Sequence, residues 1–266
     1  MRSYGLTLVE IVVVVSIIAV LMVLAVAPAR TCREYARDIV CRSNLKQLSV
    51  AFATYEVANG TFPPAFHGVV PMEPPEPGYA GNLTCDRPGW WWFNYVGQND
   101  YTEHKSILWC PSRKTDHQRI DNLLHGNYGV NESVCKRSYG IRTWAEIVGR
   151  PLNLSEITSP ARTLMMLDCG YAAIAWWHAT DESPHPLNTD VLDTAYVPGM
   201  KINTTKKLWE GQHRDAIRGR HRNKRVNIAF ADGHVDSKPA ENLFVRKDPN
   251  SYDNLYPLWM PKWSPK

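Results

Sequence analysis

The first 60 residues carry one long pattern of apolar positions that changes character half way along. An apolar run extends from Leu6 to Ala27, and Glu10 is its only charged residue. At ~1.5 Å per residue these 22 residues would form a helix about 33 Å long, which is enough to cross the hydrocarbon core of a bilayer. We therefore expect a membrane-spanning or filament-core helix at residues 6–28.

The same helix is expected to continue beyond the apolar run as an amphipathic stalk at residues 29–59. Apolar side chains recur there at helical spacing, at Cys41, Leu45, Leu48, Phe52 and Tyr55. Asn59-Gly60 then supplies a left-handed cap, and two prolines shortly afterwards prevent the helix from continuing. The apolar stripe would face a head domain formed by residues 60–266.

After residue 60 the pattern becomes short and irregular, as in an α+β domain. Val226, Ile228 and Phe230 alternate with small or polar residues, which predicts a half-buried strand. Asp232-Gly233 suits a tight type I′ turn that leads into a second strand. The expected fold is α+β, with a long N-terminal helix packed on an antiparallel β-sheet head.

Glu10 needs an explanation because a carboxylate inside a spanning helix costs ~2.5–3.5 kcal/mol on insertion scales. A secretory signal peptide is excluded because Gly5, the small residue with a polar flank, precedes the apolar run. Cutting after Gly5 would create a positively charged amino group on Leu6. In a bundle of helices that amine can meet Glu10 of a neighbouring copy, which would favour assembly.

The stretch from Gly5 to Glu10, GLTLVE, resembles the type III signal of type IV pilins and type II secretion pseudopilins. In that family a prepilin peptidase cuts after the glycine and methylates the new N-terminus, and the glutamate registers subunits. The resemblance implies a leader at residues 1–5, a scissile bond between Gly5 and Leu6, and an assembly role for Glu10. Leu6 departs from the usual Phe, and the alternative is an ordinary N-terminal anchor with an incidental glutamate.

A narrower resemblance extends to about residue 240. Its landmarks are Cys41–Leu48, Gly60–Pro64, Trp109–Ser112, Asn127–Asn131, Ser159–Thr163 and Phe230–Val235. They are similar to the prepilin-like family named for a C-terminal H-x9-DG motif. In this chain ten residues, not nine, separate His221 from Asp232. This resemblance implies a pseudopilin-like subunit and no substrate.

The cysteine content fits an oxidising compartment, although six cysteines allow fifteen pairings. Cys41 and Cys110 both lie inside family landmarks, and a disulfide between them would tie the stalk to the head. Such a bond would contribute roughly 4 kcal/mol by the chain-entropy estimate. The pairing of the other four stays open, namely Cys32, Cys85, Cys135 and Cys169.

Histidine and carboxylate side chains near the predicted hairpin form the candidate metal site. The simplest interpretation is a plain hairpin with no cofactor. The alternative is that His221, Asp232 and His234, with or without Asp168, converge on a structural metal, because these are usual ligands for zinc. No run of closely spaced acids suggests calcium.

The charge pattern and the aromatic residues limit the classes of molecule that the chain is expected to bind. A net charge of +4 without a basic helix excludes nucleic acid. The basic segment at residues 214–225 is expected to be a solvated loop, with an acidic docking partner as the alternative. The aromatic side chains of Trp90–Phe93 and Trp176-Trp177 are predicted to lie in the core and at an interface with a neighbouring subunit. The alternative is that some of them stack on a sugar.

The combined prediction is a non-enzymatic, pseudopilin-like subunit of a type II secretion pseudopilus or type IV pilus-like fibre. Its partners would be the prepilin peptidase, other pilin-like subunits, the membrane and an inner-membrane assembly platform. It would cross the inner membrane once, with its N-terminus cytoplasmic and its head in the periplasm or outside the cell. The first alternative is an anchored envelope protein whose head binds a glycan or other ligand. The second is a metal-dependent hydrolase built on His221, Asp232 and His234, which ranks last because no catalytic constellation accompanies them.

Overall fold

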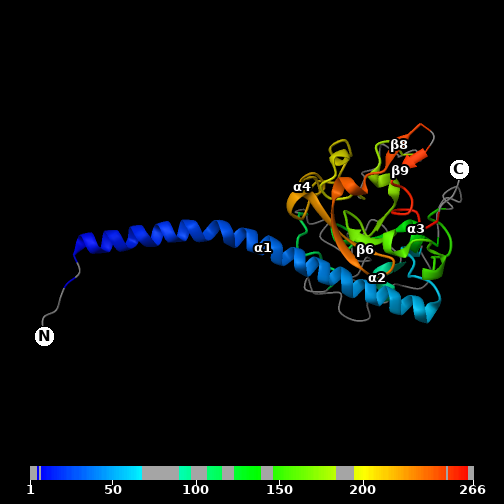
Figure 1. Cartoon of the computed structure of the whole chain (residues 1–266), viewed down its shortest axis with the longest axis horizontal. Helices are drawn as coiled ribbons and strands as arrows, with labels where there is room; N and C mark the ends of the chain where they lie inside the picture. The colour runs from blue at the N-terminus through cyan, green and yellow to red at the C-terminus, as the bar shows by residue number, and fades with distance from the viewer. Residues whose placement is uncertain are drawn as a thin grey trace.

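The computed structural model shows a long helix that packs through its C-terminal half on a mixed head (Figure 1). It describes residues 5, 7–67, 90–96, 107–115, 123–138, 146–183, 195–249 and 251–262, without the side chains of residues 23–30. Helix α1 (Leu8–Asn59) begins with a capping box between Thr7 and Glu10. It ends at Gly60, whose φ of 75° lets its N–H bond to the Glu56 carbonyl, because glycine adopts the left-handed conformation without strain.

The prediction of a membrane span at residues 6–28 is wrong. Of the helices in the described part of the chain, none combines the length and the apolar character that a bilayer crossing requires. The expected fold class is therefore corrected in one part. The N-terminal helix is not shown to be a membrane span, whereas the assignment to the α+β class is kept.

The head is built on a five-stranded sheet with the order β5-β3-β4-β6-β7. Its strands are β3 (Tyr128–Asn131), β4 (Leu164–Asp168), β5 (Ala173–Ile174), β6 (Arg225–Phe230) and β7 (Val235–Pro239). Three neighbouring pairs are antiparallel, as predicted, but β5 runs parallel to β3. The reason is that β5 reverses direction after β4 and joins the sheet on the far side of β3, instead of beside β4.

Shorter elements surround this sheet. The strands are β1 (Phe66–His67) paired with β2 (Trp90–Trp91), and β8 (Arg246–Asp248) paired with β9 (Ser251–Asp253); the helices are α2 (Trp92–Val96), α3 (Glu132–Cys135) and α4 (His213–Arg218). Single turns of 3₁₀-helix are η2 (Leu154–Glu156), η3 (Pro160–Arg162), η4 (Trp176–Ala179), η5 (Lys201–Thr204), η6 (Arg222–Lys224) and η7 (Ala240–Leu243).

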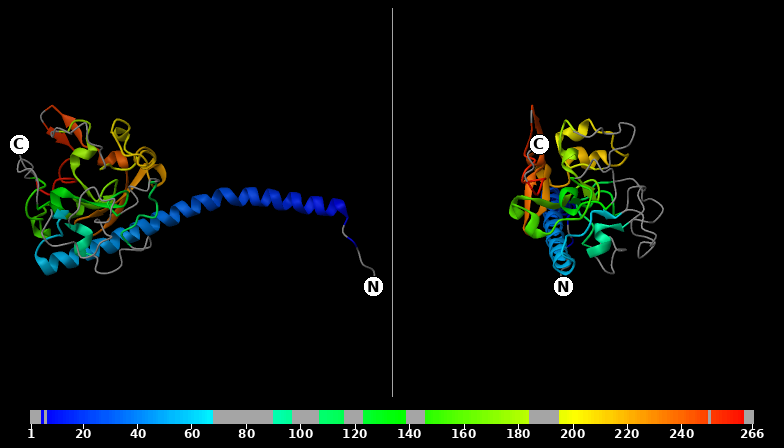
Figure 2. Two further views of the ribbon diagram at one scale, coloured as in Figure 1. Left: turned by 180° about the vertical axis from the view of Figure 1, so that it is seen from behind. Right: turned by 90° about the vertical axis from the view of Figure 1, so that its right-hand side faces the viewer.

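The sheet separates two apolar cores. On one face the α1 stripe is buried against the sheet and α2, through Cys41, Leu45, Leu48 and Phe52. The views in Figure 2 show that only the C-terminal half of α1 lies along the head. On the other face Val226, Ile228 and Phe230 pack with Trp176 and Trp259. Strand β6 is thus buried on both faces, and the prediction of a half-buried strand is wrong because α1 covers its second face.

Two local irregularities adjust which way side chains point. The β4/β6 register shifts between Leu164 and Met166, and this bulge turns the consecutive Met165 and Met166 into the same core. The predicted hairpin of β6 and β7 is confirmed, but its turn is not type I′. Gly233 has a φ of 85° whereas Asp232 does not adopt positive φ, and type I′ requires positive φ at both central residues.

Gly129 in β3 offers a test of packing inside the sheet. A Cβ added there would lie well under 3.0 Å from the Tyr171 carbonyl oxygen and the Cys169 sulfur. We expect Gly129→Ala to lower the free energy of unfolding by about 1–3 kcal/mol, because the Tyr171 obstacle is backbone. Gly5→Ala, whose new methyl group meets nothing, is the matched control when both variants are unfolded in denaturant as uncut chains that retain residues 1–5. A wild-type midpoint for Gly129→Ala would contradict this packing.

Candidate functional site

Four chemically active side chains meet between α1 and the sheet. They are Cys41 from α1, Cys110 from the loop at residues 107–115, Asp168 from the end of β4 and His221 from the turn before β6. All four are buried, and one ligand atom of each lies within 4.8 Å of the others. We call these four residues the buried cluster.

The contacts within the buried cluster are direct. The Cys41 Sγ lies 3.8 Å from the Cys110 Sγ and 3.7 Å from Asp168 Oδ2. The imidazole Nε2 of His221 lies 2.5 Å from the same Asp168 oxygen. The structure therefore brings together the cysteines predicted to pair, and it holds both as free thiols.

A second layer of polar groups orients the buried cluster. The other imidazole nitrogen of His221, Nδ1, lies 3.0 Å from Asp38 Oδ1 on α1. Asn227 in β6 joins both carboxylates, since its backbone N–H donates to Asp168 Oδ1 at 3.3 Å and its amide donates to Asp38 Oδ1 at 2.9 Å. The imidazole is thereby held between two carboxylates, one on each side.

The burial and the close packing of the cluster shift the pKa values of its two thiols and its imidazole. Burial raises the pKa of Cys41 well above its usual value, with contributions from Cys110 and Asp168. Burial acts in the same direction on Cys110, but hydrogen bonds to Cys41 and His221 and the charge of Arg220 lower its pKa to about 5. For His221, the charge and hydrogen bond of Asp168 outweigh burial and raise the pKa to about 12. The buried groups around the pair therefore perturb both thiols.

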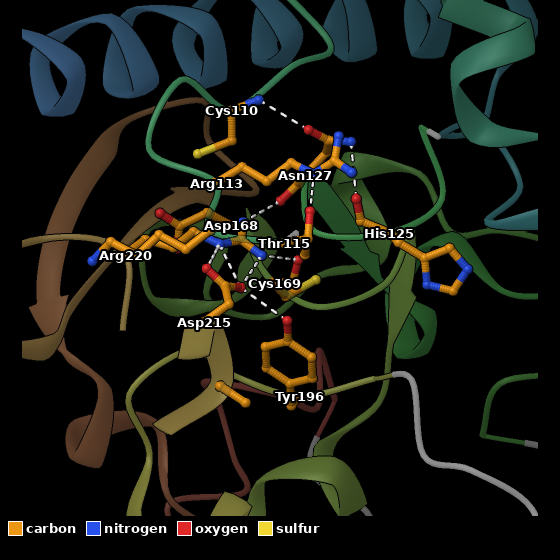
Figure 3. A network of polar contacts seen from close by, with 12 residues as sticks. Cys110, Arg113, Thr115, His125, Asn127, Asp168, Cys169, Tyr196, Asp215 and Arg220 are labelled. Carbon is orange, nitrogen blue, oxygen red and sulfur yellow. Dashed lines mark hydrogen bonds and ion pairs between the residues drawn. The ribbon is translucent and has the colours of Figure 1, made fainter. Parts of the chain in front are cut away.

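Arg220 and Asp215 form a buried ion pair directly beside this cluster (Figure 3). The guanidinium contacts the carboxylate at 2.8–3.0 Å, and the Tyr196 hydroxyl donates to the same carboxylate at 2.9 Å. The Arg220 guanidinium also donates to the carbonyl oxygens of Asn127 at 2.8 Å and Cys169 at 2.6 Å. The prediction that residues 214–225 form a solvated loop is therefore wrong for Arg220, although Arg214 and Arg218 are exposed.

The alternative interpretation, in which His221 converges with Asp232 and His234 on a metal, does not hold in this structure. Asp232 and His234 pair with each other at 2.6 Å on the hairpin, and both are partly exposed. In the described part of the chain, the buried cluster is the single group of at least three His, Cys, Asp or Glu side chains close enough for one metal ion. His221 and Asp232 lie at opposite ends of β6, and six residues of strand span roughly 20 Å. Asp168, the fourth candidate, does lie beside His221, with 2.5 Å between Oδ2 and Nε2.

The other predicted site residues fall outside this centre. Gly5 and Glu10 are exposed at the N-terminal end of α1, whereas Leu6 and Cys85 lie outside the described residues. Cys32 is exposed on α1, and Cys135 and Cys169 are buried elsewhere as free thiols. Trp91, Trp92, Trp176 and Trp177 are buried in the two cores, which removes these rings from any surface on which a sugar could stack.

The sequence alone did not predict that Cys41 and Cys110 lie next to Asp168 and His221. The available signals were a carboxylate at the end of a buried strand and two cysteines inside the segments that resemble the prepilin-like family. Comparisons of the chain with protein-family models, curated proteins and solved structures gave no match.

Proposed function

We propose that this protein is a pilin-like structural subunit that assembles into a fibre through the N-terminal part of α1. The observation that carries the proposal is the apolar surface of that helix. Every described side chain from Leu8 to Met22 is exposed, and Glu10 is the only charged one among them. An apolar surface of this size without a partner in its own chain indicates an interaction site.

The distribution of the apolar side chains favours packing of this helix among several neighbouring helices over packing against one neighbour along a single stripe. Large apolar residues occupy all sides of this part of α1, because the consecutive residues Val12, Val13, Val14 and Val15 are all exposed and successive residues of a helix point about 100° apart. A helix that is apolar all round is stable in water only when it is surrounded. The head packs on the C-terminal half of α1 and leaves the N-terminal half to project, where several neighbouring helices can reach it (Figure 1).

Glu10 would set the register of such a bundle. Its carboxylate accepts hydrogen bonds from the Thr7 backbone N–H at 2.7 Å and the Thr7 hydroxyl at 2.8 Å, and these bonds lower its pKa. The carboxylate is therefore ionised in the single chain. After cleavage between Gly5 and Leu6, the new amino group of a neighbouring copy would be its counter-ion. The resemblance of residues 5–10 to the prepilin signal supports this step and the prepilin peptidase as a partner.

The same proposal assigns no reaction to the head. Its role would be to present a surface on the fibre in the periplasm or outside the cell, with assembly driven by a platform at the inner membrane. The buried tryptophans support this role over the alternative of a glycan-binding head.

We expect Glu10→Gln to reduce incorporation into fibres at least tenfold, because the helix bundle loses its charge pair. The measurement is immunoblotting of sheared fibres from cells of the native host, with mass spectrometry of the mature N-terminus. Glu34→Gln, which neutralises an exposed acid further along α1, is the matched control and should assemble normally. Fibres containing Glu10→Gln at the wild-type level, or a mature chain that retains Met1, would contradict the proposal.

A further inference from the structure

We infer that Cys41, Cys110, Asp168 and His221 form a buried, four-coordinate zinc site that fastens α1 to the head. The inference concerns the packing of the helix on the sheet and stands whether or not the chain assembles into a fibre. It is carried by the donor set, the spacing of the ligand atoms and the groups behind them.

The donor set suits zinc better than other common cations. Two thiols, one imidazole nitrogen and one carboxylate oxygen meet at one point. Zinc accepts sulfur, nitrogen and oxygen ligands together, usually four of them in a tetrahedron. Calcium and magnesium prefer oxygen ligands throughout, so a site that is half sulfur disfavours them.

Two of the distances between ligand atoms match those around a tetrahedral metal. Two thiolates at ~2.3 Å from zinc lie about 3.8 Å apart, and a thiolate and a carboxylate oxygen lie about 3.6 Å apart. The observed distances are 3.8 Å between the two sulfurs and 3.7 Å from Cys41 Sγ to Asp168 Oδ2. The His221 Nε2 and Asp168 Oδ2 atoms are 2.5 Å apart and must separate by about 1 Å, as their mutual contact is replaced by bonds to the metal.

The groups behind the ligands already have the arrangement that a zinc site requires. His221 directs Nε2 into the buried cluster, and its Nδ1 lies 3.0 Å from the Asp38 carboxylate. The pair is not aligned as a hydrogen bond here, but a small rotation of the imidazole would give the contact of carboxylate–histidine–zinc triads. The Asn227 N–H binds Asp168 Oδ1, which leaves Oδ2 to face the sulfurs. The Cys110 N–H is fixed by the Asn127 side chain at 3.1 Å, and Asn127 is in turn held by Arg220 through its carbonyl.

The metal would be structural. The four ligands complete the tetrahedron and all are buried, so no coordination position is open to a water or a substrate. They come from four segments that are far apart in the sequence. A single ion would therefore join the helix, a loop and two strand ends at one point.

A disulfide between Cys41 and Cys110 is the competing state, because it would consume both thiolates. In that state Asp168 and His221 would contact each other but would have no metal to bind. The two states are distinguished by measuring zinc and free thiols on the same sample of full-length protein from its native compartment. The zinc content comes from elemental mass spectrometry, and the thiols come from alkylation and non-reducing peptide mapping.

We expect about one zinc per chain, with Cys41 and Cys110 unoxidised. Cys41→Ser and His221→Gln should each lower the zinc content at least tenfold, whereas Cys135→Ser, which removes a buried thiol outside the cluster, should keep it. Removal of the ion with a chelator should lower the Tm by about 10 °C, and equimolar zinc should restore it.

Cobalt titration of the reduced wild-type chain keeps the test independent of whether the variants fold. Tetrahedral cobalt with thiolate ligands gives visible bands and a sulfur-to-metal charge-transfer band, which we expect to saturate at one equivalent. A Cys41–Cys110 disulfide in the native sample, or a reduced chain that takes up no cobalt, would overturn the inference. Full zinc content in Cys41→Ser would overturn it too, since the ion would then lie elsewhere.

Discussion

Replacing Arg220 by methionine should lower the free energy of unfolding of the head by about 3–5 kcal/mol. The substitution leaves the Asp215 carboxylate buried without its cation, and both side chains of the pair are fully buried. It also removes one hydrogen-bond donor from each of the carbonyls of Asn127 and Cys169, which lie in the same interior. Denaturant unfolding, followed by the tryptophan fluorescence of the head, measures the loss.

Two further variants isolate the ion pair from the loss of a long side chain. Arg218→Met changes an exposed arginine two residues away and should shift stability by less than about 0.5 kcal/mol. The double variant Arg220→Met with Asp215→Leu removes both charges and should be more stable than Arg220→Met alone, because no unpaired carboxylate remains. If Arg220→Met unfolds at the same denaturant concentration as Arg218→Met, the buried network does not contribute as described.

Truncating Phe52 to alanine should cost about 3–5 kcal/mol and loosen α1 from the head. Its ring is 1% exposed and packs 5.6 Å, centroid to centroid, from the ring of Trp92 in α2. The neighbouring Leu48 belongs to the same stripe, so the cavity would open along the contact between α1 and the sheet. Denaturant unfolding measures the stability, and limited proteolysis of α1 measures the loosening.

Val57→Ala is the matched control because Val57 lies on the same helix and is 83% exposed. It should change the free energy of unfolding by less than about 0.5 kcal/mol and leave the proteolysis pattern unchanged. Equal effects of the two substitutions would show that the stripe is not the surface that holds the helix to the head.

The elements with a local signal were predictable. The four- and three-residue spacing of the α1 stripe places Cys41, Leu45, Leu48 and Phe52 on one helix face, and all four are buried. The pairing of β6 with β7 also follows from local alternation and a glycine turn. The turn type was mistaken because a dipeptide does not reveal that Asp232 keeps negative φ.

The interior of the head was less predictable, since it depends on which elements cover each other. Strand β6 looks half-buried along the chain and is buried on both faces because α1 lies across it. Arg220 looks like one of several solvated basic residues and is buried because Asp215, five residues before it, meets it inside the head. Neither outcome has a periodic signature.

The sequence by itself determined three features: the apolar helix with Glu10 near its start, the amphipathic continuation to Asn59, and the presence of a β-hairpin. Each of them is defined by residues that are neighbours along the chain. What only the tertiary structure decided is the centre formed by Cys41, Cys110, Asp168 and His221. These residues lie more than 50 positions apart, and chain folding alone brings them within a metal's reach. The predicted partner Asp232 is excluded because a strand that starts beside His221 carries the chain away from it.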